Sequence, residues 1–82
     1  MIFLTDVVDY VTSVSACNGT ADTNKYLAPS TSQPIVNQYI YDDAGLTSPY
    51  NGNISWHLMS YNGNSWAVFI ETDGLIVTVV EC

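Results

Sequence analysis

Two nearly identical short sequences, Tyr50–Trp56 and Tyr61–Trp66, lie about one strand-length apart in the second half of the chain. Each contains Asn-Gly, the dipeptide that most strongly favours a tight β-hairpin turn, because both residues tolerate a positive φ. Two copies are too few for a solenoid or a propeller, so we interpret the repetition as one turn chemistry used twice. The second copy therefore predicts where the backbone reverses.

Three apolar segments, separated by turn sequences, make up the C-terminal third. We predict strands over Ile54–Tyr61, Ser65–Thr72 and Leu75–Glu81, joined by Asn62-Gly63-Asn64 and by Asp73-Gly74. The middle strand is apolar at successive positions, which is typical of a strand covered on both faces. A helix can cover one face, and we expect a long loop or another protein to cover the other.

The N-terminal segment has the apolar periodicity of a helix. Apolar residues recur at the spacing of one helix face, at Leu4, Val7, Val8, Val11 and Val14. We predict a helix that begins after Thr5, its N-cap, and ends near Ala16. The valines argue against it, because β-branched residues are poor helix formers, but the periodicity favours the helix.

The segment Asn18–Pro34 has no periodic apolar pattern and is rich in Thr, Ser, Asn, Ala and Pro, so we predict a long loop. Ile35–Tyr41 fits either a helix or a strand, and its Val, Ile and Tyr content favours a strand. The predicted fold class is therefore α+β. One domain over residues 1–82 has an N-terminal helix packed on a small antiparallel sheet with a C-terminal three-stranded meander.

The charge balance is unusual because cations are missing. The chain of 82 residues has eight acidic residues, one lysine and no arginine, which gives a net charge of -7. Direct binding to nucleic acid or to an anionic membrane is disfavoured, since no cluster of cations exists to contact phosphates. A surface of Asn, Ser, Thr and Tyr is uncharged and forms hydrogen bonds, which suits virion, extracellular or assembly proteins.

The two cysteines, Cys17 and Cys82, are far apart in the sequence. The N-terminal residues do not resemble a secretory signal and no apolar run is long enough to span a bilayer. We therefore expect a virion or host-cell cytoplasmic location and two reduced thiols. The alternative is a disulfide that closes a loop of most of the chain.

The chain lacks the residue clusters that common enzyme mechanisms require. His57 is the only histidine, and we expect it to be half-exposed on its strand, with Cys17 a small buried residue rather than its nucleophilic partner. Asp42 and Asp43 are expected to form a solvated turn rather than a calcium site. No phosphate-binding motif is present. We therefore predict a protein that is not an enzyme and that has no cofactor or metal.

The predicted function is protein interaction. Aromatic side chains among Asn and Ser are typical of interfaces, although Trp66 is expected in the core and Trp56 fits either the core or the surface. The leading hypothesis is a small viral or phage-type structural or assembly component that docks on a protein partner or a second copy through its sheet. The alternative is an acidic inhibitor of a basic site; carbohydrate binding is less favoured. The candidate partner-binding residues are Trp56, Met59, Phe69, Tyr61, Asp42 and Asp43.

Overall fold

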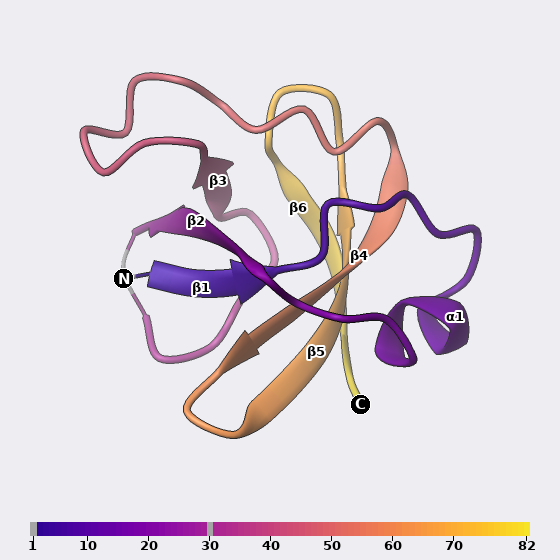
Figure 1. Cartoon of the computed structure of the whole chain (residues 1–82). Coiled ribbons are helices and arrows are strands. Elements are labelled where there is room, and N and C mark those ends of the chain that lie inside the picture. Colours follow the sequence, from indigo (N-terminus) through magenta and orange to yellow (C-terminus); the bar gives the residue numbers. More distant parts are fainter. Residues whose placement is uncertain (1, 30) are drawn as a thin grey trace.

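A curled antiparallel sheet is the main structural element of the molecule (Figure 1). The computed structural model describes residues 2–29 and 31–82, and in this part of the chain six strands have the order β3-β2-β1-β4-β5-β6. The elements are β1 (Ile2–Thr5), α1 (Ser13–Cys17), β2 (Thr23–Ala28), β3 (Tyr39–Tyr41), β4 (Ser55–Tyr61), β5 (Asn64–Ile70) and β6 (Ile76–Glu81).

The sheet curls until its two outer strands meet at one end. The amide of Ile40 in β3 donates to the carbonyl of Gly74, and Ile76 at the start of β6 exchanges hydrogen bonds with Asn37 and Gln38. These bonds join the β3 side of the sheet to the β6 side near residues 74–76. The result is a barrel-like sheet that is closed at this end.

The C-terminal meander is confirmed. β4 pairs with β5 and β5 with β6, both antiparallel, within one or two residues of the predicted bounds. At the first turn Asn62 has φ 53° and Gly63 has φ 84°, the two positive values that a tight primed hairpin turn needs. Turn chemistry between two apolar segments located this hairpin, whereas the first Asn-Gly pair, Asn51 and Gly52, has no positive φ.

The predicted N-terminal helix is wrong, and with it the α+β fold class. Strands hold 45% of the chain and helix 6%, so the fold is all-β with one short helix. The segment begins as β1, which pairs with β2 and β4, and the helix α1 covers only five residues. The preference of β-branched valines for extended backbone, together with two strand partners far along the chain, outweighs the helical periodicity.

The predicted long loop is also partly wrong. Within it, β2 pairs with β1 on one side and with β3 on the other. Of the ambiguous segment Ile35–Tyr41, only β3 is a strand, and the residues before it form a turn held by the side chain of Gln38. The Gln38 amide accepts a hydrogen bond from Ile35 and donates one to the carbonyl of Pro29.

Both faces of β5 are covered by the chain itself. The inner face packs into the core of the curled sheet, formed by Phe3, Leu27, Ile40, Tyr50, Met59, Trp66, Val68, Ile70 and Ile76. On the outer face, Ala67 is fully buried and α1 packs across β4 and β5. The prediction that Trp66 lies in the core is confirmed, but the apolar middle strand does not require another protein to cover it.

A disulfide joins Cys17 in α1 to Cys82 after β6, so the prediction of two reduced thiols is wrong. The two residues are 65 positions apart, and their Cα atoms lie 5.6 Å from each other. A cross-link over such a loop stabilises a fold by about 4 kcal/mol, mainly by restricting the unfolded chain. It fastens α1 to the sheet, where five residues alone would form an unstable helix.

Candidate functional site

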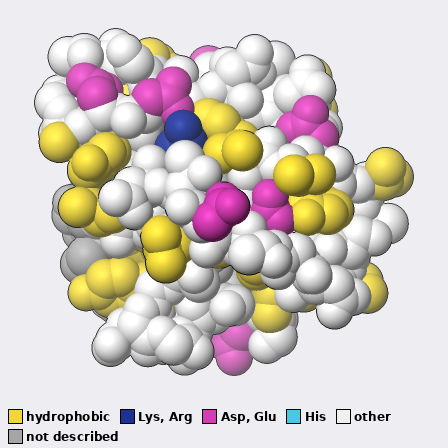
Figure 2. Space-filling view, viewed as in Figure 1, with side chains coloured by type: hydrophobic (Ala, Val, Ile, Leu, Met, Phe, Trp, Pro, Cys, Tyr) yellow, Lys and Arg dark blue, Asp and Glu magenta, His cyan; other side chains and the backbone are white. Residues whose placement is uncertain are grey.

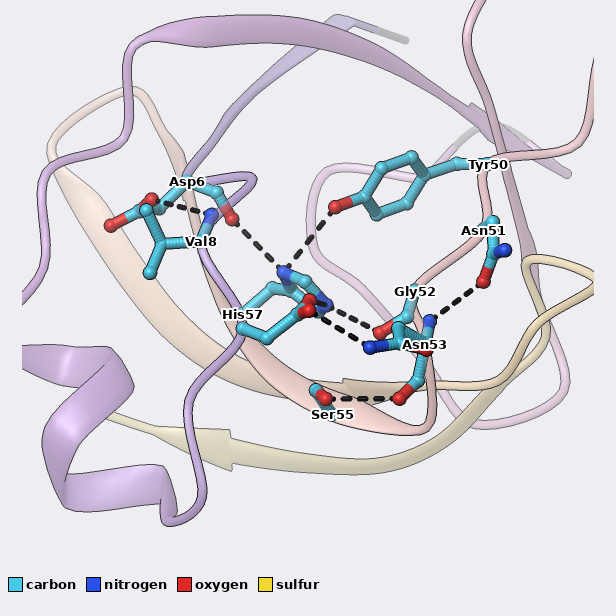
Figure 3. Close-up of polar contacts among 9 residues, drawn as sticks. Asp6, Val8, Tyr50, Asn51, Gly52, Asn53, Ser55 and His57 are labelled. Carbon is cyan, nitrogen blue, oxygen red and sulfur yellow. Dashed lines mark hydrogen bonds and ion pairs between the residues drawn. The ribbon is translucent and has the colours of Figure 1, made fainter.

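His57 lies at the centre of a buried polar cluster inside the curled sheet (Figure 3). It is fully buried, which corrects the expectation of a half-exposed side chain. Nε2 lies 2.8 Å from the carbonyl oxygen of Gly52, and Nδ1 lies 3.1 Å from that of Asp6. Carbonyl oxygens only accept hydrogen bonds, so the ring is the donor in each of these contacts that forms a hydrogen bond. Through them His57 connects β4 to the segments that contain Asp6 and Gly52.

Two further groups face the same ring. The hydroxyl of Tyr50 lies 3.4 Å from Nδ1, and Oδ1 of Asp9 lies 3.5 Å from Nε2. A doubly protonated ring donates to both carbonyls, whereas in a singly protonated ring the Tyr50 hydroxyl is placed to donate to Nδ1. A singly protonated ring has only one donor nitrogen, so one of the two carbonyls then faces a nitrogen that carries no proton.

Asp6 shapes the turn that follows β1. Its carboxylate accepts hydrogen bonds from the amide of Val8 at 3.0 Å, from the hydroxyl of Tyr10 at 2.6 Å and from the amide of Thr20 at 2.9 Å. Burial raises the pKa of this carboxyl, but the three hydrogen bonds lower it more, so the pKa lies below its ordinary value of 3.8. The turn is therefore organised around a carboxylate that is strongly held in its charged form.

The segment after Asp6 is also fastened to β4. Tyr10 and Trp56 exchange two backbone hydrogen bonds of 3.0 Å, and the side chain of Asn53 donates one of 3.0 Å to Asp9. In Figure 1 this segment runs beside the turn that leads into β4. The backbone from residue 6 to residue 10 is consequently held at both ends.

Five exposed apolar side chains lie on this segment, on the residues that follow it into α1, and in the turn before β4. We call them the valine surface: Val7, Val8, Val11, Val14 and Ile54. Val11 is 92% exposed, the largest value among the exposed large hydrophobic residues that the structure describes. Figure 2 shows hydrophobic side chains on the right of the view, over the region that holds the β1–α1 connection in Figure 1. These valines are the residues that helical periodicity had assigned to a buried helix face.

Ile54 has an unusual backbone for its residue type. Its φ is 51° and its side chain is 62% exposed. A β-branched residue in the left-handed region costs about 1–3 kcal/mol and persists only where its surroundings enforce it. Burial of the side chain does not offset this cost, because most of the side chain is exposed.

Lys25, the only lysine, is already engaged. Its Nζ lies 2.6 Å from Oδ1 of Asp42 and 4.8 Å from the centre of the Tyr50 ring. Burial, followed by the nearby carboxylates, raises the pKa of Tyr50 to about 12. The single cation is therefore used within the fold, and the remaining surface charge is acidic.

The apolar candidate residues have different environments. Met59 is fully buried in the core and is not accessible to a partner. Tyr61 is half-buried and packs on Phe3, with ring centres 5.3 Å apart. Trp56 and Phe69 are half-buried neighbours on the outer face, in an edge-to-face contact of 5.4 Å. The structure brings together only the last two.

The two acidic candidates also have structural partners. Asp42 forms the ion pair with Lys25. Asp43 caps the following turn: its carboxylate accepts hydrogen bonds from the hydroxyl of Thr47 and from the amides of Thr47 and Ser48. The Thr47 hydroxyl, followed by the Ser48 amide, lowers the pKa of Asp43 below its ordinary value. Asp42 and Asp43 therefore belong to a turn that is held in place by hydrogen bonds and an ion pair.

The described residues hold no pocket and no cluster of three or more potential metal ligands. In the same part of the chain, no helix has the length and apolar character needed to cross a membrane. Cys17 is bonded to Cys82, so it does not form a thiol pair with His57.

The chain was compared with known proteins in three ways. No protein-family model, no curated protein and no solved structure matches it.

The Asp6–His57 cluster was missed at the level of sequence. The available signal was the alternation of β4, which correctly separates Trp56 and Leu58 from Ser55 and His57. The error lay in choosing which set faces the core: Leu58 is buried on the outer face, where α1 packs on β4, and His57 is buried inside the curled sheet. A short strand covered on both sides carries no local signal that distinguishes the two faces.

Proposed function

We propose that this protein is a non-enzymatic interaction module that binds another protein through the valine surface. The single observation that carries the proposal is the exposure of Val11 and its apolar neighbours on a backbone that hydrogen bonds hold in place. Isolated exposed apolar residues are common, but a group of them on adjacent, fastened segments is typical of an interaction site.

The ordered backbone of the turn after β1 supports a binding role for its exposed valines. The turn is fixed by the Asp6 carboxylate and by the backbone pairing of Tyr10 with Trp56. A surface that is already ordered loses little conformational entropy when a partner binds. The strained backbone of Ile54 adds a second apolar group beside this turn at a cost in stability.

The charge of the chain indicates the character of the partner. The net charge is -7 and the single lysine is ion-paired, so a partner surface with apolar pockets and surrounding cations is complementary. Such charges mainly accelerate association, whereas the apolar contacts supply affinity. An acidic inhibitor and an assembly component would both use this chemistry.

The disulfide supports an oxidising location, because such bonds persist in extracellular proteins and on virion surfaces. This favours the virion rather than the host-cell cytoplasm among the two expected locations. The most concrete form of the proposal is therefore a viral or other exposed structural component that docks on a larger protein assembly.

A photo-crosslinking experiment tests the proposal. The benzophenone amino acid p-benzoylphenylalanine replaces Val11 in one protein and Leu46 in a matched control, since Leu46 is also an exposed apolar residue but lies in the loop after β3. Each protein is irradiated in its native source. We expect a discrete product from position 11, and we expect excess unlabelled wild-type protein to compete it away.

The competitor provides the second control. Excess Val11→Ser protein should compete at least about tenfold less well than wild type, since loss of a central apolar contact typically costs more than 1 kcal/mol. Equal labelling from positions 11 and 46, or equal competition by the Val11→Ser protein, would show that the valine surface is not the binding site.

A further inference from the structure

The outer side of β6 is an open sheet edge. At the start of this strand, Ile76 donates to the carbonyl of Gln38 and accepts from the amide of Asn37, at 2.8 and 2.9 Å. Beyond that point the neighbouring segment leaves, and β6 continues to Glu81 at the end of the strand order. The curled sheet is thus closed near Ile76 and open beside the rest of β6.

The register shows which backbone groups face the open side. The amide of Cys82 donates to Ser65 next to β5, so alternate residues back along the strand also face β5, and Val79 and Glu81 face away from it. Within residues 2–29 and 31–82, no backbone hydrogen bond reaches the outer side of Val79 or Glu81. Two amides and two carbonyls are therefore available at this edge.

Other parts of the sheet boundary are covered. Next to β3, the carbonyl of Ile40 accepts from the amide of Tyr50, and Tyr41 forms a bridge with Pro49. The open part of β6 lacks two of the usual protections against strand addition, because Val77–Val80 holds no proline and no lysine. All four of its residues are β-branched, and the register shift between β5 and β6 lies at Phe69/Ile70, before Val79. The disulfide at Cys82 also holds the end of the strand in place.

We propose that this edge accepts an extended segment of a partner protein as an additional antiparallel strand, with a lysine or arginine of that segment opposite Glu81. The four available backbone groups provide the hydrogen bonds, as in other strand-addition complexes. Opposite charges directly across antiparallel strands stabilise the pair. A second copy of this chain is the less suitable occupant, because each copy has a net charge of -7 and its one lysine is bound to Asp42.

A peptide titration observed by NMR tests the proposal. The probes are acetyl-Lys-Val-Lys-Val-Lys-amide and its glutamate counterpart, acetyl-Glu-Val-Glu-Val-Glu-amide, added to the isotope-labelled full chain. We expect the lysine peptide to shift the amide resonances of Val79 and Glu81 and to slow their hydrogen exchange. The glutamate peptide should do neither.

A backbone substitution separates strand addition from simple charge attraction. Val79→Pro removes an amide that faces outward, which an edge strand tolerates, and should weaken peptide binding by at least about tenfold. Val79→Thr keeps the amide and should bind like wild type. If the proline variant does not fold, Glu81→Lys provides the second test, and it should transfer the preference to the glutamate peptide.

Three further results would show whether a partner segment binds at the β6 edge. Absence of shifts at Val79 and Glu81 with the lysine peptide, or unchanged binding by folded Val79→Pro, would overturn the proposal. A dimer in sedimentation that Val79→Pro abolishes would also overturn it, by making a second copy the occupant. Val11→Ser should leave peptide binding unchanged, so this inference and the proposed role of the valine surface can fail independently.

Discussion

The hydroxyl of Tyr10 donates a hydrogen bond of 2.6 Å to Oδ2 of Asp6, across the turn that presents Val7 and Val8. A Cβ atom on Gly19 would lie 2.3 Å from the same carboxylate oxygen, so the pair packs closely on the backbone after α1. One carboxylate thus connects β1, the exposed valines and the segment that leads into β2. The conformation of the turn that carries Val7 and Val8 depends on this contact.

The stability of the protein should fall in acid because of Asp6. Its folded pKa is lowered, so the stabilisation is present above the unfolded pKa of about 3.9 and is lost as pH falls through the lower folded value. Unfolding by urea, measured at decreasing pH below about 4, should show this loss in wild type. Asp6→Asn should reduce stability at pH 7 by about 2 kcal/mol and weaken the acid dependence; an equally steep acid dependence in that variant would argue against this role.

The two Asn-Gly sequences should respond differently to the same substitution. A Cβ on Gly52 would lie 2.4 Å from Cβ of Ile70, so Gly52→Ala should destabilise the fold by about 3 kcal/mol. A Cβ on Gly63 meets nothing within 4 Å, and Gly63→Ala should cost only about 1 kcal/mol for its φ of 84°. Thermal or urea unfolding distinguishes them, and equal losses would contradict the packing described for Gly52.

Replacement of Ile54 should stabilise the fold while weakening binding. Asparagine tolerates the left-handed backbone at φ 51°, so Ile54→Asn should raise the free energy of unfolding by about 1 kcal/mol. The same change removes an exposed apolar group from the valine surface and should lower affinity for the partner. A variant that is less stable than wild type would show that the side chain is held by packing rather than presented for contact.

The disulfide should be present in protein from the native source. Alkylation without prior reduction should label neither Cys17 nor Cys82, and reduction should lower the free energy of unfolding by about 4 kcal/mol for a separation of 65 residues. The double variant Cys17→Ser/Cys82→Ser should match the reduced protein. Two labelled thiols, or a midpoint unaffected by reduction, would contradict the cross-link.

The parts of the fold that sequence reasoning located are those fixed by local chemistry. The turn at Asn62 and Gly63 requires positive φ at both residues, and this requirement identifies the hairpin and aligns β4 with β5. β1 and β2 have no such signal. Leu4 pairs with Asn24 and Ser60, partners that are distant in sequence and that no local pattern indicates.

Most of the candidate site could not be predicted from local sequence patterns. The periodic valines matched a helix face by spacing alone, and only the structure shows that the Asp6 carboxylate turns this segment outward. His57 was assigned to the wrong face because both sides of β4 are covered. The disulfide depends on the meeting of the short helix and the chain end, which the sequence leaves open as one of two alternatives.

The most direct test is a calorimetric titration of the crosslinked partner, once purified, with wild type, with Val11→Ser/Val14→Ser and with the control Leu46→Ser. We predict that the double variant keeps the wild-type melting temperature, because both valines are exposed, and binds at least about tenfold more weakly, while the control binds like wild type. Equal affinity of all three proteins would contradict the account.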